Sequence, residues 1–160
     1  MNIRSQFIDY LQSPLGLLEI QASIQHLEAI KFVSDYSLPT NPNVVTSKTK
    51  EQLTEYFAGS RQRFTLPLGA KGTQFQQQVW QQLLKIPYGT TCSYSHIAQA
   101  MQNPKAVRAV GAANGRNPLT IVVPCHRVIG ADGSLTGYAW GTSIKAALLQ
   151  HEQTHKYPKS

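Results

Sequence analysis

The chain has 160 residues, 41% of them hydrophobic, and a formal net charge of +7 at pH 7. This length fits one medium or two small globular domains with a buried core. No uncharged run is long enough to span a bilayer, the first eighteen residues lack the pattern of a signal peptide, and two cysteines are too few for a disulfide framework. These features exclude a transmembrane protein and a disulfide-rich secreted one, and we expect a soluble cytoplasmic protein with reduced thiols.

The positive charge lies in the second half of the chain. Residues 1–70 hold six lysines and arginines and six acids, whereas residues 71–160 hold nine bases against Asp132 and Glu152. A polyanion such as a nucleic acid is the natural partner of such a half. Charge alone leaves open a basic surface that binds nothing anionic.

The first half predicts a small α+β domain. Short segments rich in apolar and aromatic residues, separated by turn formers, predict an antiparallel meander made of residues 6–11, 17–22 and 27–33. A helical period starts at Thr46 and ends at Gly59. The apolar face of this helix consists of Leu53, Tyr56 and Phe57. Residues 59–72 contain glycine and proline without a sustained period, which predicts a linker.

The second half opens with a glutamine-rich helix. Thr73 is its predicted N-cap, and the turn formers at residues 87–89 end it. The apolar residues that share one face of this helix are Phe75, Val79, Trp80, Leu83 and Leu84.

Two short helices follow in quick succession. The first covers residues 94–101 with Ser93 as its cap, and the second has Asn103 as cap, Pro104 at its first position, and runs towards residues 114–115. Two short helices joined by a tight turn in a basic half predict a helix-turn-helix. An ordinary helical hairpin is the alternative.

Small residues cover the second of these helices, namely Ala106, Ala109, Gly111, Ala112 and Ala113. A helix this slim can enter a narrow groove, and Arg108 is the long cation placed to reach further in. The alternative is that the alanines pack against a neighbour and Arg108 is solvated.

Cys125 follows an apolar segment that we predict to be a strand, residues 120–123, and Pro124 fixes the backbone just before the thiol. His126 and Arg127 come next, and cations beside a thiol stabilise the thiolate that attacks electrophiles. A buried cysteine in an apolar segment is otherwise inert core.

The run PCHRV at residues 124–128 resembles the signature of the alkylguanine-DNA alkyltransferases, also called methylated-DNA–protein-cysteine methyltransferases. Further similar pieces are FQQQVW at 75–80, IPYGTTCSY at 86–94, NPKAVRAVGAANGRNP at 103–118 and GSLTGY at 133–138. The resemblance covers residues 73–152, while the first seventy residues match only in length and coarse pattern. It implies an α+β chain with two domains: a small ribonuclease H-like α/β domain at 1–70, and a mainly helical domain at 71–160 with a winged-helix-like helix-turn-helix.

The resemblance also implies catalytic roles. Cys125 is the implied acceptor thiol, and His126, acting through a water, takes its proton while Glu152 orients the imidazole and stabilises its charge. Tyr94 lends a proton towards N3 of the leaving guanine and crowds the phosphate into rotating. Asn117 ties the helix-turn-helix to the cysteine turn.

Substrate-binding roles are implied in the same way. Arg108 fills the stack that the flipped base leaves. The implied DNA-contacting residues are Arg108, Tyr94, Ala106, Ala109, Gly111, Ala112, Asn114 and Arg116. In the implied substrate pocket the Val128 carbonyl and the backbone around Ala139 read the guanine edge, together with Tyr138 and Trp140.

The implied function is DNA repair. The alkyl group of O6-alkylguanine in duplex DNA passes irreversibly to the protein's own cysteine after base flipping, and each molecule acts once. Alkylthymine as a second substrate stays open. Many relatives have a glycine pair after the tyrosine where this chain has Ala139 and Trp140, although some family members also carry tryptophan. Trp140 predicts a narrow pocket that accepts methyl and disfavours benzyl groups.

We expect a monomer without a cofactor or metal. Some relatives hold zinc in the first domain, but this chain has only His26 and no cysteine there. His151 and His155 have the spacing of a chelating pair, yet on a polar helix we expect them to be solvated. Cys92 is expected to be a bystander. The rival interpretations are a helix-turn-helix regulator, a lesion-flagging protein without transfer activity, and a cysteine hydrolase.

Overall fold

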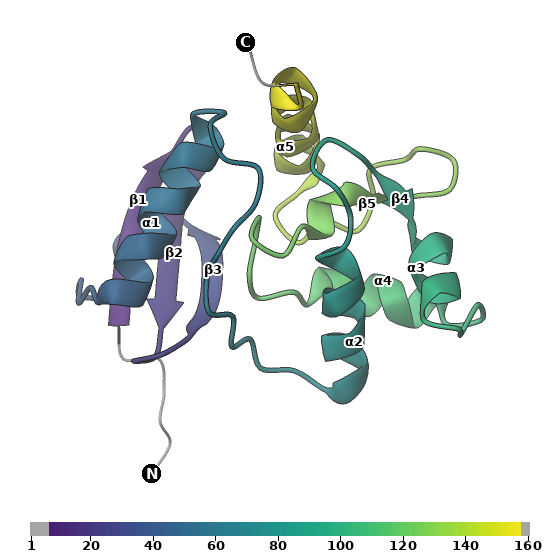
Figure 1. The fold of residues 1–160 in the computed structure, drawn as a ribbon, viewed down its shortest axis with the longest axis horizontal. Helices are drawn as coiled ribbons and strands as arrows, with labels where there is room; N and C mark the ends of the chain where they lie inside the picture. Colours follow the sequence, from purple (N-terminus) through teal and green to yellow (C-terminus); the bar gives the residue numbers. More distant parts are fainter. Residues whose placement is uncertain (1–6, 158–160) are drawn as a thin grey trace. The chain divides into compact units, whose positions relative to one another are not determined.

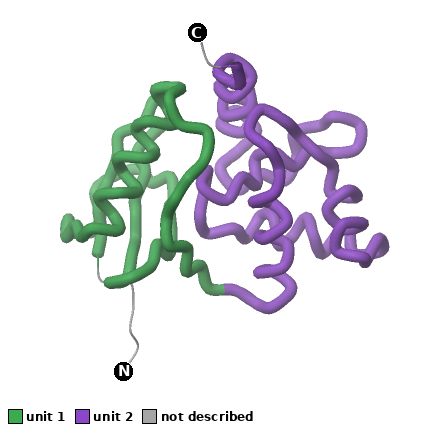
Figure 2. The backbone as a smooth tube through the Cα atoms, in the orientation of Figure 1, with its two compact units in different colours: residues 1–71 green, residues 72–160 purple. Residues whose placement is uncertain are grey.

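The computed structural model describes residues 7–157. The chain divides into two compact units, one within residues 1–71 and the other within residues 72–160 (Figure 2). The first unit holds a sheet and one helix, and the second is mainly helical (Figure 1). The predicted α+β class is therefore confirmed.

The first unit contains the predicted meander. Strands β1 (Phe7–Ser13), β2 (Gly16–Ala22) and β3 (Leu27–Val33) are antiparallel in the order β1-β2-β3. Pro14 and Leu15 form the tight turn between the first two strands, and Gly16 follows with a φ of +138°, which favours glycine.

Helix α1 (Val44–Phe57) packs on this sheet. It begins two residues before the predicted start at Thr46, because Thr46 acts as the third residue of a capping box whose cap is Asn43. The Asn43 side chain accepts a hydrogen bond from the Thr46 amide at 2.9 Å. Leu53 and Tyr56 are fully buried against the sheet, whereas Phe57 lies at the half-buried end of the helix.

The predicted linker is partly a sheet edge. Residues 67–69 run parallel to the start of β3: the Leu27 amide donates to the Pro67 carbonyl at 2.7 Å, and the Gly69 amide donates to the Leu27 carbonyl at 2.8 Å. The Gln52 side chain of α1 also accepts from the Thr65 amide at 3.0 Å. Backbone and side-chain hydrogen bonds thus hold the second part of this segment within the first unit.

The second unit begins with α2 (Gln74–Leu83), and Thr73 caps it as predicted. Val79, Trp80 and Leu83 are buried. Leu84, predicted on the same face, is 41% exposed because the helix ends at Leu83 and its period no longer continues. The Trp80 indole donates to the carbonyl of Ala113 at 2.9 Å, which fixes α2 against the helix that carries Ala113.

The helix-turn-helix consists of α3 (Tyr94–Ala100), capped by Ser93 as predicted, and α4 (Val107–Gly115). Our prediction for the start of α4 was wrong. The Ala106 amide donates to the Asn103 carbonyl at 3.0 Å and closes a turn through Pro104, so Asn103 begins this turn instead of capping the helix.

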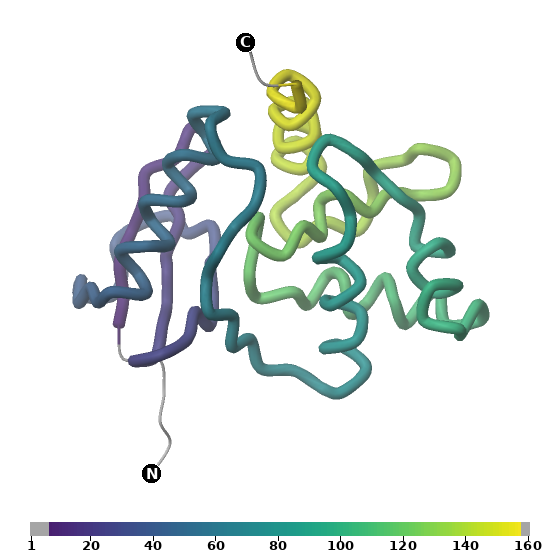
Figure 3. The backbone as a smooth tube through the Cα atoms, in the orientation of Figure 1, coloured from purple at the N-terminus to yellow at the C-terminus, as the bar shows by residue number. Residues whose placement is uncertain are grey.

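The rest of the unit carries the cysteine. The 3-10 turn η1 (Cys125–Arg127) leads into β5 (Val128–Ile129), which pairs in parallel with β4 (Cys92–Ser93), a segment far away in sequence (Figure 3). Helix α5 (Thr142–His155) is the last helix of the described residues. Among residues 7–157, no helix combines the length and apolar character needed to cross a bilayer.

Leu53 tests the packing of α1 on the sheet. We expect Leu53→Ala to lower the free energy of unfolding by about 2–5 kcal/mol, because it leaves a cavity between helix and sheet. Urea unfolding followed by circular dichroism measures this change. The control Lys48→Ala, on the exposed face of α1, should change it by less than about 0.5 kcal/mol. Equal effects of the two substitutions would contradict the packing.

Candidate functional site

A series of turns delivers Cys125 to its place. Residues 120–123, predicted as a strand, form turns instead, and Ile121 has a φ of +74°, which a β-branched residue rarely adopts. The Asn117 side chain holds these turns together: its amide nitrogen donates to the Val123 carbonyl at 2.8 Å, and its oxygen accepts from the Leu119 amide at 2.9 Å. Cys125 itself is only 7% exposed.

A buried ion-pair network lies beside the thiol. His126 Nε2 is 2.6 Å from Glu152 Oε2, and Arg127 Nε is 2.8 Å from Glu152 Oε1. Arg127 also donates to the Ile86 carbonyl at 2.7 Å, and the Gly89 amide donates to Glu152 at 3.2 Å. The short Nε2 contact assigns the proton of a neutral imidazole to Nε2, which leaves Nδ1 as the basic nitrogen.

The ionisation states differ from those that we expected. Burial raises the pKa of the Cys125 thiol, against the opposing effects of Asn117 and Lys145. Burial also lowers the pKa of His126, although Glu152 opposes this, and the nearby Arg127 lowers it further. The resting pair is therefore a thiol beside a neutral imidazole. Arg127 turns to Glu152, so the prediction that His126 and Arg127 act as cations stabilising a resting thiolate was wrong.

Glu152 is the anion of this network. Burial disfavours its charged form, but hydrogen bonds and charge from His126 and Arg127 outweigh that effect and hold the pKa of Glu152 far below its usual range. A carboxylate that stays charged at neutral pH can stabilise an imidazolium formed during a reaction.

Lys145 was not predicted from the sequence as part of the site. This fully buried residue of α5 donates to the Val128 carbonyl at 2.6 Å and the Thr136 carbonyl at 3.0 Å, and its ammonium lies 5.9 Å from the centre of the Tyr94 ring. The sequence does contain a signal for its burial. Lys145, Leu148 and Glu152 recur with helical spacing, so the two charged residues share the apolar core face of α5.

The proposed substrate-pocket residues come from β5 and the segment after it. Val128 and Tyr138 are buried, Ala139 is exposed, and Trp140 is half-buried. The indole nitrogen of Trp140 donates to the hydroxyl of Thr120 at 2.9 Å, in the turns that precede Cys125. The Tyr94 hydroxyl donates to the Thr136 carbonyl at 2.9 Å, so α3 also contributes to this region.

Most of the predicted DNA-contacting residues lie on accessible parts of α4. Arg108, Ala109, Ala112 and Arg116 are exposed, and Ala106 and Gly111 are half-buried. Asn114, which we predicted to contact DNA, does not lie on this accessible surface. It is 1% exposed and donates to the Cys125 carbonyl at 3.3 Å, because it lies on the face of α4 that packs inward.

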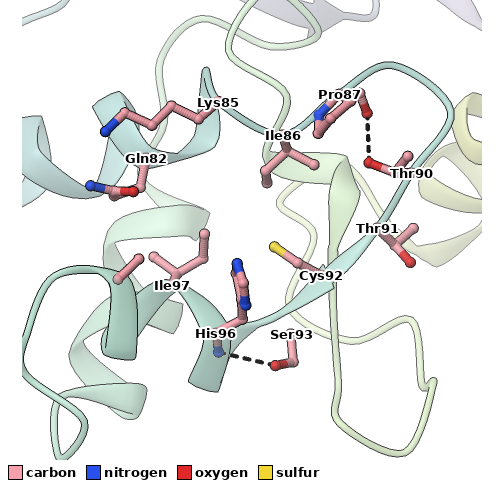
Figure 4. Close-up of a pocket in the computed structure, with 11 residues that line it drawn as sticks. Gln82, Lys85, Ile86, Pro87, Thr90, Thr91, Cys92, Ser93, His96 and Ile97 are labelled. Carbon is pink, nitrogen blue, oxygen red and sulfur yellow. Dashed lines mark hydrogen bonds between the residues drawn. The ribbon is translucent and has the colours of Figure 1, made fainter.

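The second thiol occupies a separate pocket. Cys92 lies with Lys85, Ile86, His96 and Ile97 in a hollow beside α3 (Figure 4). Burial raises the pKa of Cys92, and His96 lines the same hollow.

The histidines of α5 are only partly exposed to solvent, whereas we expected them to be solvated. His151 and His155 are half-buried, with ring centroids 4.4 Å apart. Among residues 7–157, no three His, Cys, Asp or Glu side chains gather as a metal site would require.

Comparison with known proteins agrees with this geometry. The family model described as the DNA binding domain of 6-O-methylguanine DNA methyltransferase matches residues 74–154, and the model of its ribonuclease-like domain matches residues 7–70. A constitutive methylated-DNA–protein-cysteine methyltransferase of Bacillus subtilis is 60% identical over 113 residues, covering 70% of this chain and 67% of that protein. A Methanosarcina barkeri protein of the same name is 41% identical over 155 residues, covering 93% and 98% of the two chains.

Solved structures of the same family also resemble this chain. The structure of Mycobacterium tuberculosis OGT in complex with DNA is 44% identical to this chain, with a TM-score of 0.85 and coverage of 93% of this chain and 94% of that one. The fold and the sequence matches agree over both units. The chain belongs to the methylated-DNA–protein-cysteine methyltransferase family.

Proposed function

We propose that the chain repairs DNA by moving the alkyl group of O6-alkylguanine in duplex DNA onto Sγ of Cys125. One observation carries the assignment of this residue: the Cys125 thiol is followed directly by an imidazole whose far nitrogen is held 2.6 Å from a buried carboxylate. Cys92, the other thiol, has no described arrangement of this kind.

In the proposed reaction, the Cys125 proton passes through a water to Nδ1 of His126, and Glu152 stabilises the imidazolium. The thiolate attacks the alkyl carbon, a C–S bond forms, and the carbon–oxygen bond breaks. The electron pair of that bond goes to the guanine, whose charge is neutralised by a proton from the Tyr94 hydroxyl towards N3. Burial raises the pKa of the Tyr94 hydroxyl, which keeps it protonated as the donor, and the ammonium of Lys145 lies 5.9 Å from the centre of the Tyr94 ring.

The thiol must reach an atom that faces the inside of the duplex, so the nucleotide has to flip out, at a cost of a few kcal/mol. Exposed Ala109 and Ala112 leave α4 slim enough to approach the minor groove. Exposed Arg108 extends beyond them and is our proposed residue to occupy the vacated stack. Arg116 supplies a further positive charge to the same exposed surface.

The reaction is proposed to run once for each protein molecule. A thioether carbon is a poor electrophile, so the methylated Cys125 is not restored by simple hydrolysis. The first unit is proposed to have a structural role, and the second to bind DNA and transfer the alkyl group. Because the reaction consumes a reduced thiol, we place the protein in the cytoplasm, where thiols stay reduced.

An intact-mass experiment tests the assignment of Cys125. Mixing the protein with duplex DNA that contains methylguanine should add one methyl group per chain, at Cys125 and at no other residue. Cys125→Ser should remain unmodified, while the matched control Cys92→Ser should react like the wild type. Unmodified wild-type protein bound to DNA would instead support the lesion-flagging function, and repeated turnover would support a hydrolase.

Trp140 provides a test of substrate size. The indole is anchored to Thr120, so we expect it to narrow the alkyl pocket and favour methyl over benzyl adducts. Trp140→Gly should raise the ratio of benzyl to methyl transfer rates by about tenfold or more, with little change in the methyl rate. Single-turnover rates on the two adducts in the same duplex measure this ratio.

Thr120→Val is the matched control for Trp140→Gly, since it removes the anchor and keeps the indole. Its effect should be smaller. Equal methyl and benzyl rates in the wild type, or a large loss of methyl transfer in Trp140→Gly, would contradict the proposed pocket.

A further inference from the structure

Asn114 joins the DNA-binding helix to the reactive cysteine. It lies on the inner face of α4, is 1% exposed, and donates from Nδ2 to the Cys125 carbonyl at 3.3 Å. Because a carbonyl accepts only from a donor, this contact assigns the orientation of the amide. The remaining polar atom, Oδ1, is an acceptor inside the protein.

Two buried acceptors next to Cys125 have no hydrogen-bond partner among the described residues. They are Asn114 Oδ1 and His126 Nδ1. One belongs to a side chain bonded to the Cys125 carbonyl, and the other belongs to the following residue. Unsatisfied buried polar atoms are uncommon, and a buried water that makes about three hydrogen bonds is the usual way to satisfy them.

We propose that Asn114 Oδ1 and His126 Nδ1 together hold the water that carries the thiol proton, which makes Asn114 a positioning residue for the reaction. One hydrogen of the water points to Asn114 Oδ1 and the other to His126 Nδ1, so its lone pair faces the Cys125 thiol. The thiol proton moves to the water as the water gives a proton to Nδ1. The products are a thiolate, an unchanged water and an imidazolium paired with Glu152.

Asn117 has a different task. Both polar atoms of its side chain bond to the backbone of the turns before Cys125, at the Val123 carbonyl and the Leu119 amide. Asn117 therefore shapes the turn, and its side chain also lowers the pKa of the Cys125 thiol through a hydrogen bond, whereas Asn114 keeps an acceptor for the water. The other titratable or charged groups around the relay are Tyr94 of α3, Arg127 of η1, Tyr138 of the segment before α5, and Lys145 and Glu152 of α5.

The inference rests on the proposed function, and the pH dependence of methyl transfer tests it. Asn114→Leu keeps the size of the side chain and removes both the Oδ1 acceptor and the Nδ2 donor to the Cys125 carbonyl. Near neutral pH its single-turnover rate should be lower than the wild-type rate by about tenfold or more. The difference should narrow as the pH rises towards the thiol pKa, because hydroxide then removes the proton without the relay.

A control separates this role from packing. Val110→Ala alters the same buried face of α4 one turn earlier, and any loss of rate should be the same factor at every pH. A pH-independent loss in Asn114→Leu, or no loss, would overturn the proposal. In a His126→Gln background, Asn114→Leu should cause little further loss, since both residues serve one relay. Full additivity would also overturn it.

Another pair of variants serves if Asn114→Leu fails to fold. Asn114→Ser and Asn114→Ala differ by one hydroxyl, and the serine variant should be faster at neutral pH because it keeps an acceptor. Equal rates would contradict the relay. Failure of the wild-type protein to methylate Cys125 would refute the proposed function itself, which distinguishes the two failures.

Discussion

The buried carboxylate of Glu152 is the constraint on which the site depends. A charge inside a protein must be paired and hydrogen-bonded, and the removal of one partner from such a group is strongly destabilising. Here the partners come from His126, Arg127 and the amide of Gly89, so one carboxylate fixes η1, α5 and the segment after α2 in a single arrangement. The position of the reactive thiol follows from this arrangement, since Cys125 directly precedes His126.

The same carboxylate sets the chemistry. Burial lowers the pKa of His126, and the positive charge of Arg127, which pairs with Glu152, lowers it further. His126 is therefore neutral in the resting protein. A neutral imidazole with its proton on Nε2 is a base, and in the proposed reaction it becomes a cation when it takes the proton of the thiol. The raised pKa of Cys125 favours the protonated thiol in the resting protein, which suits a residue that is proposed to react once.

The two faces of α4 connect the surface that we propose to bind DNA with this chemistry. The outer face exposes Arg108 and Arg116, and the inner face carries Asn114 to the Cys125 carbonyl. Behind it, the Trp80 indole of α2 bonds to the Ala113 carbonyl. These two hydrogen bonds fix α4 relative to Cys125, which suits the DNA-binding role that we propose for its outer face.

Local signals in the sequence predicted the parts of the fold that local physics decides. Thr73 and Ser93 cap their helices as expected, because a side-chain oxygen two or three residues before an amide is enough to define a cap. Asn103 has the same local signal but begins a turn, since the amide of Ala106 bonds to its carbonyl and not to its side chain.

Errors arose where distant contacts decide. Residues 120–123 have the apolar composition of a strand, yet the Asn117 side chain bonds their backbone into turns. Cys125, His126 and Glu152 could be found through the family resemblance. The pairing of Arg127 with Glu152 and the burial of Lys145 and Asn114 depend on α4, α5 and η1 meeting in space, which sequence spacing alone does not reveal.

The most direct test of this account is the protonation state of His126. Nitrogen NMR of the unmethylated protein, with the His126 signals assigned by comparison with His126→Gln, distinguishes the two ring nitrogens. At neutral pH the account predicts a proton on Nε2 and none on Nδ1. A proton on Nδ1, or a doubly protonated ring, would contradict it, because His126 could then not accept the proton of Cys125.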